Sequence, residues 1–279
     1  MALILILAAA TLCVAVLLWS RLWPFAEAPV LQNLREASDS QVQVRAFHRT
    51  NFPFPGCILE GAEPFYHGSG VGKPLITIEK VTIRGTYLGL LSKRVSRITA
   101  ESMRVFIPAF GTGEAFHTTP SKITIDEIVA NGASVEFASR NADKQPLLFD
   151  VHEASLRDVG WKGPLTYHLK VRNPEPPGEV TTSGKFGVWN ESDPQQTPIS
   201  GEYKFEQADL GVYHGIAGRL SSTGKFGGTL GHIDISGTTG TLDFEVKSGK
   251  HPVKLITEFS AYIDGTRGDT FLKRVNTYF

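Results

Sequence analysis

Apolar and polar residues alternate with a period of two over most of the chain beyond residue 40. The alternation is cleanest in three segments, LTYHLKVR (165–172), ISGEYKFE (199–206) and TLDFEVK (241–247). Strict alternation is typical of a strand with one apolar and one solvated face. In the third segment it places Leu242, Phe244 and Val246 on one side. No segment beyond residue 40 has a helical stripe of apolar residues, so the pattern predicts a mainly β, antiparallel structure.

Two pairs of similar segments stand out against this pattern. ITIEKVTIRG (76–85) is similar to ITIDEIVANG (123–132), and in both the apolar phase shifts in the middle. A shift of phase indicates a β-bulge within a strand or a tight turn between two strands. SGKFG (183–187) is similar to TGKFG (223–227). Repeats at such spacings predict stacked units that each bury only part of a face.

The first twenty residues carry no charge, and Thr11 is the only polar residue from Ala2 to Trp19. A bilayer core about 30 Å thick needs ~20 apolar residues as a helix. Aromatic and basic residues follow where such anchors sit in the headgroup region, and Pro24 ends the helix. We therefore expect a single-pass membrane anchor over residues 1–23, formed by Leu3, Leu7, Val14, Leu18, Trp19 and Trp23.

A cleaved secretory signal is the competing interpretation of this segment. Its apolar core would be roughly 7–15 residues long, shorter than the one present here. The nearest small-x-small triplet, Ala26-Glu27-Ala28, is followed by Pro29. The sequence favours an uncleaved anchor. The orientation of the anchor stays open. No Lys or Arg precedes the helix while Arg21 and Arg35 follow it, so the positive-inside rule alone predicts a cytoplasmic domain. That rule is weak for long translocated domains.

The rest of the chain divides into two parts. Residues 24–40 are predicted to form a juxtamembrane helix or linker, with Val30, Leu31 and Leu34 on one side, and residues 41–279 one β domain. The final FLKRVNTYF (271–279) is strand-like and has no polar tail. A sheet that ends there leaves an open edge, so we expect this chain to be the N-terminal portion of something longer.

Composition and charge argue against several classes of function. Lys and Arg together number 28, as do Asp and Glu, so nucleic acid is not an expected partner. The two cysteines, Cys13 and Cys57, do not indicate a disulfide framework. The eight histidines show no metal-ligand spacing. We therefore expect no metal and no cofactor.

Candidate catalytic and phosphate motifs are incomplete. HGSGVGKP (67–74) has His67 and Pro74 where a phosphate loop needs Gly and Ser or Thr, so a glycine-rich turn is favoured. DGTRGDT (264–270) contains Arg-Gly-Asp, but its Asp and Gly content favours a hairpin turn. No Ser lies in G-x-S-x-G, and Cys57 has no basic neighbour in sequence. We predict no catalytic residues and a protein that is not an enzyme.

The apolar face itself is then the remaining candidate for function. A sheet covers its apolar side with a second layer of helices or strands, and few helices are available here. Curling the sheet into a groove or sandwich covers part of that face. A groove that stays open suits lipid acyl chains.

Several segments together resemble the AsmA-like proteins of bacterial envelopes. The resemblance begins at VQVRAFHRTNFPFPGCILEG (42–61), with its FPxPGC element, and continues through residues 73–108, including Gly89-Leu90-Leu91. It extends over TTSGKFGVW (181–189), residues 197–239 and residues 251–275, so it covers nearly the whole chain. The relatives are usually longer than this chain.

The resemblance implies an inner-membrane anchor with the β domain in the periplasm. It also implies a long, curved, open β-groove shaped like a taco, as in bridge-like lipid-transfer proteins, and a role in phospholipid transport or outer-membrane homeostasis. Its partners would be membrane phospholipids and, in an alternative role as an assembly factor acting through sheet edges, other envelope proteins. The residues predicted to line the groove are Ile76, Ile78, Tyr203, Phe205, Phe244, Val246, Leu255 and Phe259.

Overall fold

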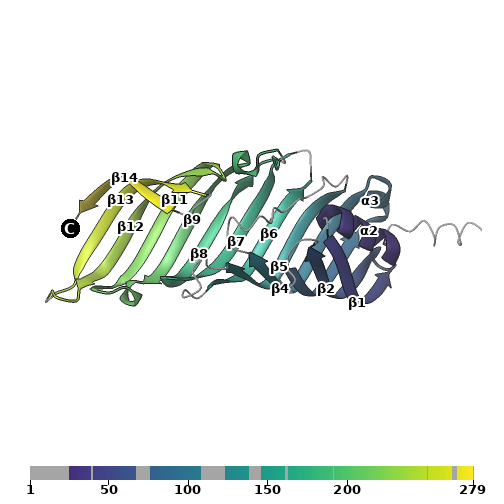
Figure 1. Cartoon of the computed structure of the whole chain (residues 1–279), viewed down its shortest axis with the longest axis horizontal. Coiled ribbons are helices and arrows are strands. Elements are labelled where there is room, and N and C mark those ends of the chain that lie inside the picture. Colours follow the sequence, from purple (N-terminus) through teal and green to yellow (C-terminus); the bar gives the residue numbers. More distant parts are fainter. Residues whose placement is uncertain are drawn as a thin grey trace, which may run out of the picture.

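One open, curved sheet contains nearly all of the regular structure of this chain (Figure 1). The computed structural model describes residues 25–38, 40–66, 76–107, 123–137, 146–160, 163–190, 192–249, 251–265 and 269–278. The sheet has 14 strands, and their order in space follows their order in sequence, except that β10 pairs with β12 beside this path. The mainly β prediction is confirmed.

The strands are long and their connections are mostly hairpins. Their bounds are β1 (Ser40–Thr50), β2 (Gly56–Tyr66), β3 (Ile76–Gly85), β4 (Arg94–Ile107), β5 (Thr124–Phe137), β6 (Leu147–Val159), β7 (Leu165–Pro174), β8 (Pro177–Phe186), β9 (Pro198–Asp209), β10 (Ile216–Ala217), β11 (Arg219–Thr229), β12 (His232–Val246), β13 (Val253–Asp264) and β14 (Asp269–Tyr278). Asp264 pairs with Asp269, which confirms the predicted hairpin between the last two strands.

One pair of neighbouring strands departs from the antiparallel prediction. β4 and β5 are parallel, with Ala100 opposite Ala130. Parallel neighbours need a connection of about a dozen residues or more, and residues 108–122, which lie outside the described ranges, join these two strands. The apolar alternation has the same period in either direction, so it could not reveal the direction of pairing.

The predicted phase shifts lie within continuous strands, at irregularities that leave the register of the neighbouring strands unchanged. In β3 the apolar phase passes from Ile78 to Val81, and the ladders on both sides of β3 skip Glu79 there without a change of register. Gly61 in β2, Ser102 in β4 and Gly132 in β5 have positive φ angles of 53–63° at this level. The neighbouring strands therefore change phase together, and apolar residues stay opposite one another on both sides of this level.

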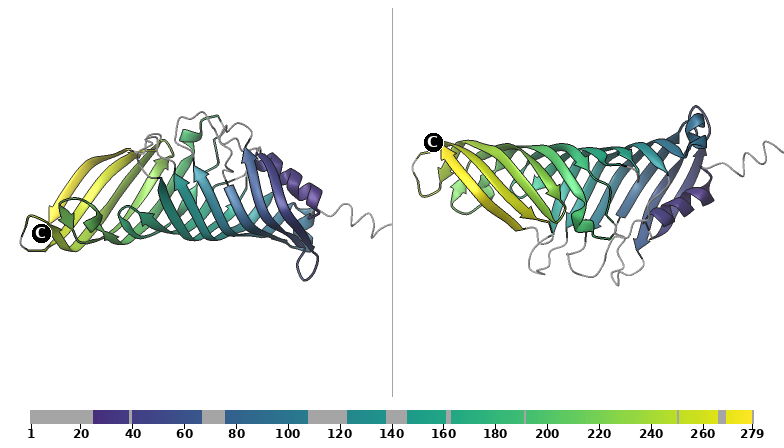
Figure 2. Two further views of the ribbon diagram at one scale, coloured as in Figure 1. Left: turned by 60° about the horizontal axis from the view of Figure 1, so that its bottom comes forward. Right: turned by 90° about the horizontal axis from the view of Figure 1, so that it is seen from above.

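The helix α2 (Glu27–Ser38) packs on the apolar face of this curved end (Figure 2). It contributes Val30, with Leu31 and Leu34 beside it, and Phe25 precedes it in the same core. This cluster also contains buried residues of the sheet: Cys57, Leu59, Ala62, Val81 and Ile83. The shared side predicted for Val30, Leu31 and Leu34 is thus the side that faces the sheet.

Three short helical segments lie among the strands, where the sequence predicted none. They are α3 (Tyr87–Leu91), η1 (Pro194–Gln196) and η2 (Leu210–Val212). Each is too short to show a periodic apolar stripe, and α3 begins at a local cap in which Thr86 accepts a hydrogen bond from the Gly89 amide. The Gly89-Leu90-Leu91 element lies within α3.

The predicted anchor over residues 1–23 lies outside the described residues, as does the HGSGVGKP segment from His67 to Pro74. Within the described part of the chain, no helix has the length and apolar character needed to cross a membrane. The juxtamembrane position of residues 24–40 therefore stays a prediction.

Docking of α2 can be tested through the buried thiol beneath it. Cys57 is fully buried, and burial raises the pKa of its thiol to about 12, so the folded chain presents almost no thiolate at pH 8. We expect Val30→Asp, in a Cys13→Ser background, to undock α2 and to raise the rate of maleimide labelling of Cys57 about tenfold or more. Gln32→Asp, on the exposed side of α2, is the matched control. Unchanged labelling in a folded Val30→Asp chain would contradict this packing.

Candidate functional site

The two faces of the sheet differ in charge over most of their extent. Ion pairs such as Lys80–Glu101 (3.3 Å), Arg97–Glu127 (3.2 Å) and Lys170–Glu179 (3.2 Å) join neighbouring strands on one face. They are largely exposed, and pairs of this kind contribute little to stability, roughly 0–1 kcal/mol each. Their importance is that they keep charge on one side of the sheet.

The opposite face has two continuous rows of uncharged residues, each formed by cross-strand partners in register. The first, the Leu59 row, crosses thirteen strands from β1 to β14: Phe47, Leu59, Val81, Ala100, Ala130, Ala154, Leu169, Thr182, Tyr203, Gly224, Gly237, Phe259 and Val275. The second, the Cys57 row, runs beside it from β2: Cys57, Ile83, Ile98, Ile128, Leu156, Tyr167, Gly184, Gly201, Phe226, Ile235, Ala261 and Leu272.

This uncharged face is the concave one. A pocket of about 340 Å³ is lined by side chains of this face from consecutive strands β11 to β14 together with η2. The helix α2 packs on the same face (Figure 2). We call this surface, made of the Leu59 row, the Cys57 row and their neighbours of the same phase, the concave apolar face. The helix α2 covers its β2–β3 end, and the rows continue beyond that helix (Figure 2).

Glycines in both rows allow aromatic rings to lie flat on the sheet. Gly224 and Gly237 are paired between Tyr203 and Phe259. A Cβ on Gly224 would lie 2.7 Å from the Tyr203 ring, and one on Gly237 would lie 2.8 Å from the Tyr203 hydroxyl oxygen. The ring of Tyr203 therefore occupies the space of two missing side chains and keeps the surface low.

The same arrangement occurs two strands earlier in the Cys57 row. Gly184 and Gly201 are paired between Tyr167 and Phe226, and a Cβ on Gly201 would lie 2.5 Å from the Tyr167 hydroxyl oxygen and 2.9 Å from the Phe226 ring. SGKFG and TGKFG supply one glycine of each pair, Gly184 and Gly224. From this repeat we predicted stacked units. In the structure it marks equivalent places in β8 and β11 of one sheet.

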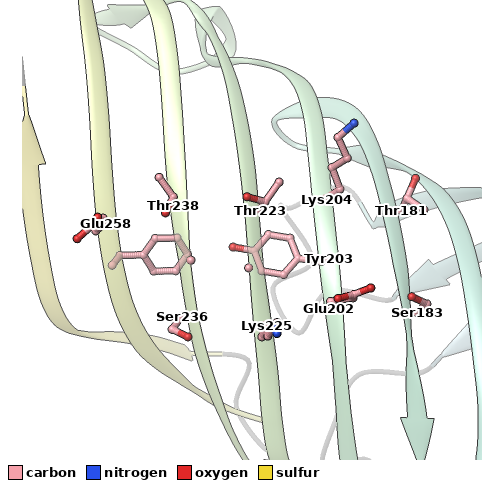
Figure 3. Close-up of a pocket in the computed structure, with 13 residues that line it drawn as sticks. Thr181, Ser183, Glu202, Tyr203, Lys204, Thr223, Lys225, Ser236, Thr238 and Glu258 are labelled. Atoms are coloured by element: carbon pink, nitrogen blue, oxygen red, sulfur yellow. The ribbon is translucent and has the colours of Figure 1, made fainter.

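A second hollow, of about 700 Å³, surrounds the later glycine pair. In Figure 3, Glu202 and Lys204 lie on either side of Tyr203 on the same strand, and the Tyr203 ring extends over the next strand. Polar residues of the opposite phase complete its lining: Thr181, Ser183, Thr223, Lys225, Ser236, Thr238 and Glu258. Most of its lining side chains belong to the charged face, so this hollow lies on the side of the sheet opposite the Tyr203 ring.

Hydroxyl groups lie in register beside the Leu59 row. Ser222, Thr239, Thr257 and Thr277 are successive cross-strand partners and form what we call the hydroxyl row. The Tyr203 and Ser222 hydroxyl oxygens are 3.1 Å apart, and those of Ser222 and Thr239 are 3.3 Å apart. Burial raises the pKa of the Tyr203 phenol, an effect partly opposed by its bond with Ser222, so Tyr203 stays a neutral hydroxyl at physiological pH.

Most of the residues predicted to line a groove share the concave apolar face. Tyr203 and Phe259 lie in the Leu59 row, Ile78 packs between the two buried clusters of the sheet, and Phe244, Leu255 and Phe259 line the 340 Å³ pocket. Phe205 is the cross-strand partner of Ser222, and Ile76 shares the phase of Ile78.

The end of β12 differs from the predicted alternation. The pairing of β12 with β13 shifts between Thr241 and Phe244, so Leu242 does not share the face of Phe244 and is 77 % exposed. Val246 lies beyond this shift, opposite Ile216 of β10, and is 46 % exposed. Alternation alone could not locate the bulge, because the residues around it, Leu242 and Asp243, continue the apolar–polar pattern.

The sequence analysis missed the glycine pairs and the hydroxyl groups. Glycine inside a strand marks a close approach of backbone or ring, and its recurrence in SGKFG, TGKFG and SGTTG was the available signal. Threonine is common in strands, so its presence gave no signal.

Chemistry-bearing residues do not gather into a second site in the described ranges. No group of three His, Cys, Asp or Glu residues there is placed to hold a metal ion. The raised pKa of Cys57 describes an unreactive core thiol.

The glycine pair makes a direct prediction about stability. A Cβ at Gly237 would lie 2.5 Å from the Thr223 carbonyl oxygen, whereas nothing lies within 4 Å of one at Gly240 in the same strand. We expect Gly237→Ala to lower the free energy of unfolding by about 1–3 kcal/mol, because strand backbone and the Tyr203 ring must shift. Gly240→Ala should leave it unchanged or raise it by up to about 1 kcal/mol. Thermal unfolding followed by circular dichroism measures both, and equal effects would refute the flat-ring packing.

Comparison with protein-family models, with curated proteins and with solved structures gives no match for this chain. The AsmA-like resemblance of the sequence therefore stays a prediction.

Proposed function

We propose that this chain is a non-enzymatic, inner-membrane-anchored protein whose β domain lies in the periplasm and binds phospholipid acyl chains along the concave apolar face. Its role would be lipid transport in support of outer-membrane homeostasis. The observation that carries the proposal is the continuity of the Leu59 and Cys57 rows, which cross the sheet with no charged residue.

The distribution of burial supports an apolar ligand. The Leu59 row is buried from Leu59 to Ala130, the end nearer α2, and only half-buried from Ala154 to Phe259. Among the described elements, α2 and Phe25 cover Leu59 and Val81 of this part, whereas Ala100 and Ala130 belong to a second buried cluster formed by side chains of the sheet. A half-buried apolar row gains roughly 25 cal/mol for each Å² that a ligand removes from water. Acyl chains provide that area without requiring partners for polar groups.

The form of the face also fits cargo that moves. Each strand contributes one small or apolar residue per row, and strands are spaced about 4.8 Å apart. An acyl chain that lies along a row therefore exchanges similar contacts as it slides from strand to strand. Binding is distributed over many weak contacts, so no single contact has to hold the lipid.

Lipid binding can be tested with two neighbouring threonines on β12. Thr239 belongs to the concave apolar face, whereas Thr238 is exposed on the opposite face. We expect the full-length chain, purified in mild detergent, to retain phospholipid detectable by mass spectrometry. Thr239→Glu should reduce the retained lipid about fivefold or more, since it places a charge among apolar chains. Thr238→Glu should retain as much as the wild type. A wild-type chain that is consistently free of lipid would refute the proposal.

Photo-cross-linking separates this role from the alternative of an assembly factor acting through sheet edges. Phe259 lines the pocket on the concave apolar face, and Tyr262, three residues along the same strand, stacks with His232 and Phe271 on the opposite face. With p-benzoylphenylalanine in place of Phe259, we expect phospholipid adducts in native membranes; in place of Tyr262, we expect none. Protein adducts from β14, such as at Tyr278, with no lipid adducts at position 259, would favour the assembly role.

A further inference from the structure

We propose that the pocket at strands β11–β14 is a subsite for the ester region of a diacyl lipid, in which threonine hydroxyls bond to the ester carbonyls. This inference rests on the proposed function and adds chemical selectivity to it. The pocket has a volume of about 340 Å³ and an otherwise apolar lining, supplied by Leu210, Leu220, Phe244, Leu255, Phe259, Leu272 and Val275. Three threonines, Thr239, Thr241 and Thr257, complete it.

The key residue is Thr241, which is only 2 % exposed. The other two buried hydroxyl residues have partners: Thr197 accepts from the Asn190 amide at 3.1 Å, and Ser222 bonds within the Tyr203–Ser222–Thr239 chain. Throughout the described part of the chain, no hydrogen-bond partner is found for the Thr241 side chain. A buried hydroxyl without a partner is unfavourable, so its presence in an apolar pocket points to a partner on the ligand.

The neighbouring hydroxyls are placed to act with Thr241. Thr239 precedes Thr241 by two residues on the same face of β12, and Thr257 is the cross-strand partner of Thr239. The chain Tyr203–Ser222–Thr239 contains three O–H donors and only two hydrogen bonds, so one donor is left for a ligand. Thr257 likewise has no side-chain partner among the described residues. Three adjacent positions thus offer donors on an apolar surface.

The geometry favours carbonyl acceptors over charged groups. No Lys, Arg or His lines the pocket, so nothing there would neutralise a phosphate. The ester carbonyls at the glycerol ends of the two acyl chains are neutral acceptors that can enter an apolar pocket together with the chains. Dialkyl-ether lipids have the same chains and headgroups without these carbonyls. Ester and ether lipids therefore differ only in the group that the threonines would recognise.

The test is a competition between the two linkages. The full-length chain in mild detergent is incubated with equimolar dioleoyl phosphatidylethanolamine and its dioleyl-ether counterpart, washed, and the retained lipids are quantified by mass spectrometry. We expect the wild type to retain the ester lipid about three- to tenfold over the ether lipid, as one or two neutral hydrogen bonds provide. Thr241→Val should bring the ratio close to one by lowering the retention of the ester lipid. Thr238→Val, on the opposite face of the same strand, should keep the wild-type ratio.

Folding of the variants is checked separately. Thr241→Val removes an unpaired buried hydroxyl and nearly preserves its shape, so the lipid-free variant should unfold at the same temperature as the wild type or higher. Thr257→Val, at a half-buried position, provides a second variant that should also lower the ester-to-ether ratio. A wild-type ratio of one, or a ratio unchanged in both variants, overturns the subsite. Retention of neither lipid by the wild type overturns the proposed function as well.

Discussion

This sheet must bury its apolar face by curving, because α2 is the only long helix that the described part of the chain supplies to cover that face. Neighbouring strands change their apolar phase together at irregularities aligned at one level, from Gly61 in β2 to Gly132 in β5. The two cross-strand rows run beside this level in unbroken register, so their apolar phase is preserved from strand to strand. A shift by one residue in any strand would carry its apolar residues to the other face and interrupt both rows. Register is therefore the constraint on which the concave face, its pocket and its freedom from charge all depend.

The residues along each row change in size with their surroundings. Under α2 the Leu59 row has Leu59 and Val81, which pack into a buried core with that helix. Alanine follows at positions Ala100 and Ala130, and farther along the row the ring of Tyr203 lies flat over Gly224 and Gly237. Small residues give up packing within the sheet, and strand glycines are unfavourable unless something else fills their space. Aromatic rings fill it here. The result is a low apolar surface, whereas larger aliphatic side chains would have filled the concavity from within.

The sequence predicted the class of fold because one strong signal, alternation, dominates long strands such as β9. It also located the change of phase within β3 and β5, because such a change interrupts the alternation visibly between Ile78 and Val81. Strand direction left no such mark, since alternation reads the same both ways, and so the parallel pairing of β4 with β5 was missed. The pocket was missed for a related reason. Thr241 is ordinary in a strand, and only the three-dimensional structure shows that its hydroxyl is buried without a partner in the described residues.

A lipid conduit has to bind cargo without trapping it, and the two parts of the concave apolar face would meet these requirements in different ways. Along the rows, each methylene contributes a similar small amount, roughly 0.8 kcal/mol when fully buried, at every strand that it crosses. Sliding then replaces one set of contacts with an equivalent set, and the free energy changes little. The threonine pocket is a local exception, because hydrogen bonds are directional and must break before the lipid advances. With each neutral bond worth only about 1 kcal/mol net, such a pocket would select the linkage of the lipid and slow its passage by about tenfold or less per bond. Selectivity at one position and mobility along the rest of the surface are therefore compatible on the same sheet.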